Sequence, residues 1–122
     1  NIAEAHGATA DVKVDIGYPS SVNSDAMVAK FFPTLKRVAG AAGATEGGVT
    51  MAGEDFSRFS ALAPGFFFNL SVTPPNLDLK TVASNHSPLF QGDDRALTVG
   101  VRAMTSMAMD FLRSGGVPKL IP

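Results

Sequence analysis

The sequence contains no cysteine and no tryptophan, and only two histidines and one tyrosine among 122 residues. Without cysteine, the chain has neither disulfide bonds nor thiolate metal sites of its own. The sequence also has no large excess of positive or negative charge, because ten basic residues offset eleven acidic ones and the basic residues are scattered. We therefore expect neither a nucleic-acid partner nor attachment to an anionic membrane surface. No apolar run approaches the roughly 20 residues that span a bilayer.

Several catalytic motifs are missing as well. There is no Gly-rich phosphate loop, no HExxH helix and no Ser nucleophile elbow. What is present is a chain of 45% hydrophobic and 17% charged residues. So low a charged fraction favours a buried interface with another segment. Residues 2–6 are typical of a last helical turn capped by Gly7, yet five residues are too few for a stable helix. We therefore expect this chain to be part of a longer protein.

The hydrophobic pattern predicts an α/β fold, with a sheet flanked by helices. Residues 9–16 alternate between apolar and charged side chains, which indicates a half-buried strand. Residues 66–72 are apolar on both faces, which is typical of a strand inside a covered sheet. Helices are predicted from Asn23 or Ser24 to about residue 39, over residues 54–62, and from Asp93 or Asp94 to about residue 112. A Tyr-Pro turn near residue 18 predicts a boundary between two domains, residues 1–18 and residues 19–122.

Two helical stripes are expected to face the core. Pro33 lies inside the first of these helices and is expected to kink or split it. Gly100 and Ala103 form a small-residue face on the last helix, which would let another element approach closely. The tail after residue 116 is expected to be mobile. The stripe residues are Val28, Phe31, Phe32, Leu35 and Val38 on the first helix, and Leu97, Val101, Met104, Ala108 and Phe111 on the last.

His86 is the first candidate for chemistry, because it lies in a polar connection between a predicted strand and a predicted helix. Neutral imidazole is a common ligand of zinc and similar metals. A complete site needs two or more further ligands, and no side chain lies at ligand spacing from it. On the residues alone, a surface histidine without a function is the favoured interpretation. His6 is expected to be structural, near a helix C-terminus.

Glu54 and Asp55 form the second candidate, at the start of a predicted short helix. Helix capping explains two carboxylates at this position. Alternatively, the backbone N–H groups of Gly53 and Glu54 could face an anionic ligand, or a carboxylate could orient a metal ligand. The sequence leaves these alternatives open.

Taken together, these motifs resemble the C-terminal part of the M20 family of metallopeptidases and amidohydrolases. The most similar branch contains aminoacylases, hippurate hydrolases and auxin-conjugate hydrolases. The resemblance covers nearly the whole chain: a helix, Gly and strand that end in a Tyr-Pro turn and Asn23, a Met-x-x-Glu-Asp-Phe signature at residues 51–56, a Pro-Gly-x-Phe-Phe strand at residues 64–68, and a His-Ser-Pro-x-Phe loop at residues 86–90.

The resemblance implies a two-metal hydrolase, usually with zinc and in some cases with manganese or cobalt. It implies that His86 binds one of the metals, that Gly53 and Glu54 line the substrate pocket, and that Asp55 supports the metal ligands. The substrate would be an N-acyl amino acid or a small peptide. Two metals would activate a water molecule for attack on the amide, with a carboxylate as general base.

The same resemblance implies a division of labour along a longer chain. Residues 1–18 would end an inserted lid domain that makes a homodimer, and residues 19–122 would belong to the catalytic domain. The other metal ligands and the general base would lie upstream, so the chain alone is expected to be inactive. The alternatives are a non-catalytic binding module with this fold, and an M20 branch acting on dipeptides or N-succinyl compounds.

Overall fold

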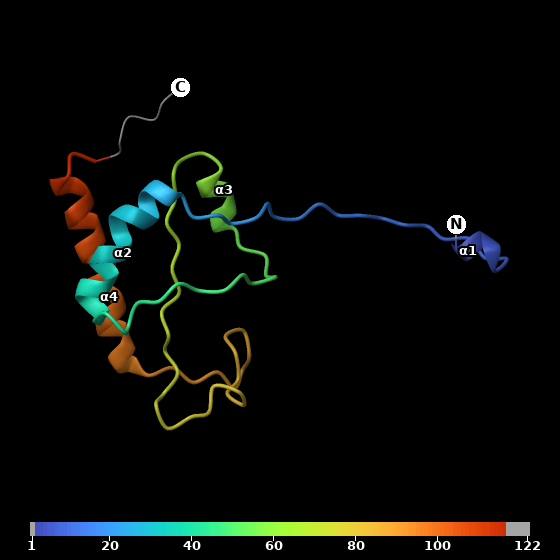
Figure 1. The fold of residues 1–122 in the computed structure, drawn as a ribbon. Coiled ribbons are helices and arrows are strands. Elements are labelled where there is room, and N and C mark those ends of the chain that lie inside the picture. Colours follow the sequence, from blue (N-terminus) through green and yellow to red (C-terminus); the bar gives the residue numbers. More distant parts are fainter. Residues whose placement is uncertain (1, 117–122) are drawn as a thin grey trace.

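The computed structural model describes residues 2–116 and contains four helices joined by extended and turn segments (Figure 1). The helices are α1 (Ile2–Ala5), α2 (Asp25–Ala39), α3 (Phe56–Ser60) and α4 (Asp94–Arg113). Helices α2 and α4 pack against each other and form the only helix pair in extensive contact within residues 2–116. Figure 1 shows α1 at the end of a long extended segment that leads away from this pair.

Local signals place the ends of α2. Ser24 has the extended backbone of an N-cap residue, Asp25 lies favourably in the first turn, and Gly40 ends the helix with a φ of 82°. Pro33 does not split α2, which continues through it. The two residues that α2 buries are Met27 and Thr34, and both lie one position away from the predicted stripe.

Helix α4 begins where the sequence predicts. The side chain of Asp93 caps it by accepting a hydrogen bond from the backbone N–H of Arg95. It ends at Ser114, which is followed by two glycines with positive φ. The predicted close approach at its small-residue face is confirmed, because a Cβ on Gly100 would come within 2.8 Å of the Leu70 side chain.

The α/β prediction is wrong. Residues 2–116 form helices but no strand, and residues 9–16 and 66–72 run as extended chain without a ladder of hydrogen bonds. The physical reason is that a strand exists only when its N–H and C=O groups pair with a neighbouring strand. Alternating apolar residues indicate which side chains share a face, but they do not supply that neighbour. Val12, Val14 and Ile16 are accordingly exposed.

Isolated hydrogen bonds hold residues 65–72, which we call the central segment. The side-chain amide of Asn23 accepts from the N–H of Phe67 at 2.6 Å and donates to its carbonyl oxygen at 2.8 Å. The N–H of Ser24 donates to the oxygen of Gly65. At the other end, the N–H of Asp93 donates to the oxygen of Val72. The starts of α2 and α4 therefore fix the central segment between them.

The predicted core stripe of α4 is only partly correct. Ala103 and Met107 are the buried residues of this helix, and Phe111 packs against Phe31 of α2 with ring centroids 6.3 Å apart. Leu97, Val101 and Met104 are exposed. The stripe is wider than the surface that α2 and the central segment can cover, so its outer half faces solvent.

No helix within the described residues is both long and apolar enough to cross a membrane. The prediction that the tail is mobile concerns residues 117–122, which lie outside the described part of the chain. The boundary predicted near residue 18 stays a prediction.

Candidate functional site

The Glu-Asp-Phe signature forms the start of α3. Oε1 of Glu54 accepts a hydrogen bond from the N–H of Phe56 at 3.0 Å. Asp55 occupies the N-cap position, but its side chain makes no capping hydrogen bond. Capping is therefore one function of this pair, and Glu54 rather than Asp55 carries it out. The carboxylate of Asp55 stays exposed.

Gly53 lies against the Tyr-Pro turn. A Cβ at Gly53 would be 3.4 Å from Cδ2 of Tyr18, so the two residues are in van der Waals range. Arg58 of α3 reaches the same turn: its guanidinium lies 5.7 Å from the ring centroid of Tyr18 and donates to the oxygen of Gly17 at 3.3 Å. The Tyr-Pro turn and α3 with its preceding Gly53 therefore contact each other, although they lie more than 30 residues apart in the sequence.

His86 lies in a loop built from consecutive turns. The N–H of Ser87 donates to the oxygen of Ser84, and Ser87 in turn accepts from Phe90 through its carbonyl and from Leu89 through its hydroxyl. His86 has a φ of 72°, the one positive value among the non-glycine residues described. Histidine adopts this left-handed conformation more readily than most residues, though still uncommonly. Such backbone strain is found preferentially at functional sites.

The described residues do not form a metal site by themselves. No three His, Asp or Glu side chains within residues 2–116 lie close enough together to hold a metal ion. His86, Glu54 and Asp55 therefore do not converge in this chain. The imidazole of His86 is exposed and can supply one ligand, whereas a zinc site needs at least three protein ligands.

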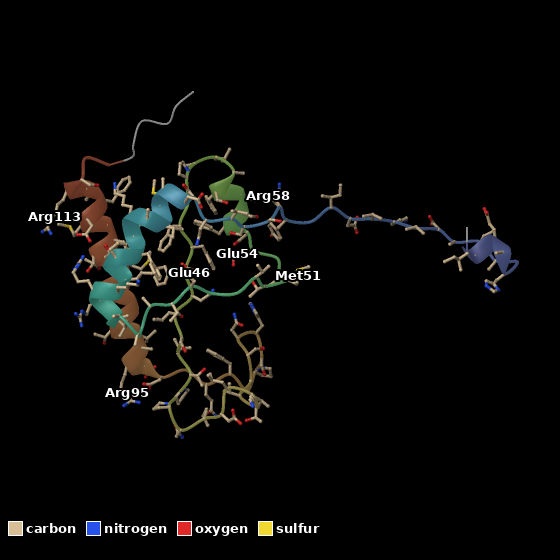
Figure 2. All side chains as sticks on the ribbon, in the orientation of Figure 1. Glu46, Met51, Glu54, Arg58, Arg95 and Arg113 are labelled. Carbon is tan, nitrogen blue, oxygen red and sulfur yellow. The ribbon has the colours of Figure 1, made fainter. Side chains whose placement is uncertain are left out.

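Figure 2 shows Glu54 and Arg58 close to α3, and Met51 at the tip of the loop that leads to it. In Figure 1, this loop and the loop after the central segment lie on one side of that segment, and α2 and α4 lie on the other. The candidate residues are thus on the side away from the packed helices.

A cavity of about 460 Å³ opens between the helices and the central segment. Most of its wall residues are phenylalanines and methionines, and Phe56 links it to the Glu-Asp-Phe signature. Phe56 also contacts Phe67, with ring centroids 5.4 Å apart. The cavity is lined by Met27, Phe31, Phe56, Phe66, Met104 and Phe111, among others.

Shifted pKa values occur away from the candidate site. A hydrogen bond from Thr34, together with the guanidinium of Arg37, lowers the pKa of the Asp110 carboxyl. Hydrogen bonds from Arg95 lower the pKa of Asp93. The carboxylate of Asp110 joins α4 to α2, and the carboxylate of Asp93 caps the start of α4, so both have a structural role.

Sequence reasoning missed two contributors to this region. Asn23 appeared only as part of a motif, yet its side chain fixes the backbone of Phe67. Tyr18 was taken as a marker of a boundary, yet it packs beside Gly53. The signal was present, since both residues belong to the Tyr-Pro-to-Asn motif, but the motif alone does not say what they contact.

Comparison with known proteins gives several partial matches. The chain is 27% identical over 110 residues to the amidohydrolase YhaA of Bacillus subtilis, a match that covers 90% of this chain and 27% of the relative. It is 30% identical over 95 residues to an IAA-amino acid hydrolase ILR1-like protein of Arabidopsis thaliana, covering 78% of this chain and 21% of the relative. The resemblance to the M20 family is confirmed.

A third match extends the range of organisms. Thermostable carboxypeptidase 1 of Saccharolobus solfataricus is 30% identical over 112 residues, which cover 91% of this chain and 27% of that protein. This M20-like chain thus spans only about a quarter of the length of the curated relatives it matches. No family model matches the chain, and no solved structure matches it.

Proposed function

We propose that this chain is part of a metal-dependent hydrolase that cleaves the amide bond of N-acyl amino acids or small peptides. Three relatives support the reaction class, since their names describe an amidohydrolase, an amino-acid-conjugate hydrolase and a carboxypeptidase. The observation that carries the proposal is the His-Ser-Pro-x-Phe loop, which presents His86 in an exposed, left-handed conformation.

In this proposal, His86 is one ligand of a site for two divalent metal ions, most suitably zinc. The remaining ligands and the general base come from residues that this chain does not contain. Gly53 and Glu54 contribute to the substrate pocket. Their support is the position of Gly53 beside Tyr18, and the fact that no hydrogen bond within residues 2–116 satisfies the N–H of either residue. Asp55, with its exposed carboxylate, is assigned to the support of a metal ligand.

The assignment to a two-metal hydrolase also implies protein partners. The remainder of an M20-type hydrolase completes the site, and residues 1–18 belong to the part that makes a homodimer. Between the two substrate classes, the auxin-conjugate relative supports N-acyl amino acids and the carboxypeptidase relative supports small peptides. No contact among residues 2–116 favours either class.

The test is an assay of the longest polypeptide that contains these 122 residues, beside the 122-residue chain alone. N-acetyl and indole-acetyl amino acids probe one substrate class, and dipeptides probe the other. We expect turnover only in the longer polypeptide, and a loss of at least about a hundredfold in its His86→Ala variant. His6→Ala is the matched control and should change activity less than twofold. Hydrolysis by the 122 residues alone, or full activity of His86→Ala, would refute the proposal.

A further inference from the structure

Residues 9–22 form an extended segment that meets the rest of the structure beside α3 (Figure 1). Ile16 is 94% exposed, whereas Tyr18, two residues later, is 57% exposed. Among the described residues, the oxygen of Gly17 is the one group of this segment that takes part in a hydrogen bond. The attachment of the segment is therefore concentrated at Gly17 and Tyr18.

Arg58 of α3 makes both polar contacts at this point. Its guanidinium donates to the oxygen of Gly17 at 3.3 Å and lies 5.7 Å from the ring centroid of Tyr18. The same ring lies against Gly53, where an added Cβ would be 3.4 Å from Cδ2 of Tyr18. The ring of Tyr18 thus connects the side chain of Arg58 with the backbone of Gly53.

The opposite side of α3 is fixed by packing. Ser57, next to Arg58, is 1% exposed, and Phe56 contacts Phe67 of the central segment with ring centroids 5.4 Å apart. Consecutive helical residues point about 100° apart, so α3 buries Ser57 while Arg58 reaches outward to the turn. A substitution of Arg58 should therefore act on Tyr18 and not on the packing of α3.

The loop that leads to α3 has few other anchors. Residues 45–53 are exposed and make no hydrogen bond with any described residue. The first hydrogen bonds after them involve Glu54, which accepts from Phe56 and Ser57. The position of Gly53 in this loop therefore depends on its contact with the ring of Tyr18.

We propose that Arg58 is a positioning residue for the substrate pocket. It holds the ring of Tyr18 against Gly53 and so fixes the backbone at the pocket wall. The inference rests on the proposed function, which assigns Gly53 and Glu54 to that pocket. Loss of an interaction that serves substrate binding, and not the chemical step, raises KM and leaves kcat nearly unchanged.

The contact itself can be measured at a single side chain. The 122 residues contain one tyrosine, so 3-fluorotyrosine gives one fluorine NMR resonance, which reports on Tyr18 alone. Arg58→Met keeps a long side chain and a good helix former, and should remove about half or more of the displacement of this resonance from free fluorotyrosine. Arg58→Lys retains a cation and should keep most of the displacement.

Arg102→Met is the matched control. Arg102 is an exposed arginine of α4 without an ion pair among the described residues, so its substitution should leave the Tyr18 resonance in place. A resonance that Arg58→Met and Arg102→Met move equally would overturn the proposal.

The role in the pocket is tested in the longest polypeptide that contains these residues, with N-acetyl amino acids and dipeptides as substrates. Arg58→Met should raise KM about tenfold and leave kcat within about twofold, with Arg58→Lys closer to the wild type and Arg102→Met equal to it. A merely destabilised protein would lose active molecules, which lowers the apparent kcat and leaves KM in place. An unchanged KM, or a loss confined to kcat, would overturn the proposal.

The two measurements separate this inference from the proposed function. If the wild-type longer polypeptide is inactive, the proposed function fails and the pocket role of Arg58 fails with it, whereas the fluorine resonance still decides the contact with Tyr18. If the wild type is active and Arg58→Met changes neither KM nor the resonance, the positioning role fails and the proposed function stands.

Discussion

Two segments of this chain carry the pattern of a strand and end up in opposite surroundings. Residues 9–16 alternate as a half-buried strand should, yet Val12, Val14 and Ile16 are all more than three-quarters exposed. The central segment is held at one end by Asn23 and Ser24 and at the other by Asp93. Their apolar patterns differ, but what fixes the central segment in place is the presence of groups, distant in the sequence, that satisfy its backbone.

The largest effect on stability is expected when an aromatic side chain is removed from the central segment and compared with a substitution in residues 9–16. Phe66 packs against Phe31 of α2, with ring centroids 5.7 Å apart, and stacks with Phe68. Phe66→Ala should lower the free energy of unfolding by about 2–3 kcal/mol, somewhat less than a fully buried phenylalanine would. Val14→Ala, in the exposed segment, should change it by less than about 0.5 kcal/mol. Urea denaturation followed by circular dichroism measures both, and equal effects would contradict the contrast.

The second test removes the hydrogen bonds instead of the packing. Asn23→Ala leaves the N–H and the carbonyl of Phe67 without their partner, at a cost of about 1–3 kcal/mol in unfolding free energy. Asn69→Ala is the control, because Asn69 lies in the central segment with an exposed side chain. Thermal unfolding of the two variants checks this, and an Asn23→Ala protein as stable as Asn69→Ala would show that the Asn23 bonds contribute nothing.

A third and smaller effect concerns pH. Since the pKa of Asp110 is lowered in the folded chain, its contribution to stability is present above its ordinary value of 3.8 and is lost as the pH falls through the lowered pKa. Asp110→Asn should therefore flatten the decline of stability with falling pH below about pH 5. Asp11→Asn, within the exposed segment, should leave the decline unchanged. Unfolding midpoints measured from pH 6 to pH 2 decide this.

The ends of α2 and α4 could be predicted from the sequence because their signals are local, whereas α3 is two residues shorter at each end than the predicted residues 54–62. Asp93 caps α4, Gly40 ends α2, and each signal lies within a few residues of the boundary that it sets. Burial could not be predicted as well. Met27 and Thr34, rather than the predicted stripe, are buried in α2, because the direction from which α4 approaches decides which side chains are covered.

The candidate site likewise has features that the sequence predicted and features that it did not. The motif around His86 was readable, and the relatives agree with the family that it indicated. The left-handed backbone of His86 could not be predicted, because the motif does not specify the conformation of the short turns around it. The contact between Tyr18 and Gly53 could not be predicted either, because it depends on how distant segments meet. The α/β prediction failed for the same reason: strand pairing requires partners that the described residues do not provide.

The most direct test of the central claim is the metal content of the longest polypeptide that contains this chain. Elemental analysis after gel filtration, with His86→Ala and His6→Ala as a matched pair, separates a ligand from an ordinary histidine. The account predicts about two divalent ions per protomer in the wild type and in His6→Ala, and fewer in His86→Ala. Equal metal content in all three proteins, or no metal in the wild type, would contradict it.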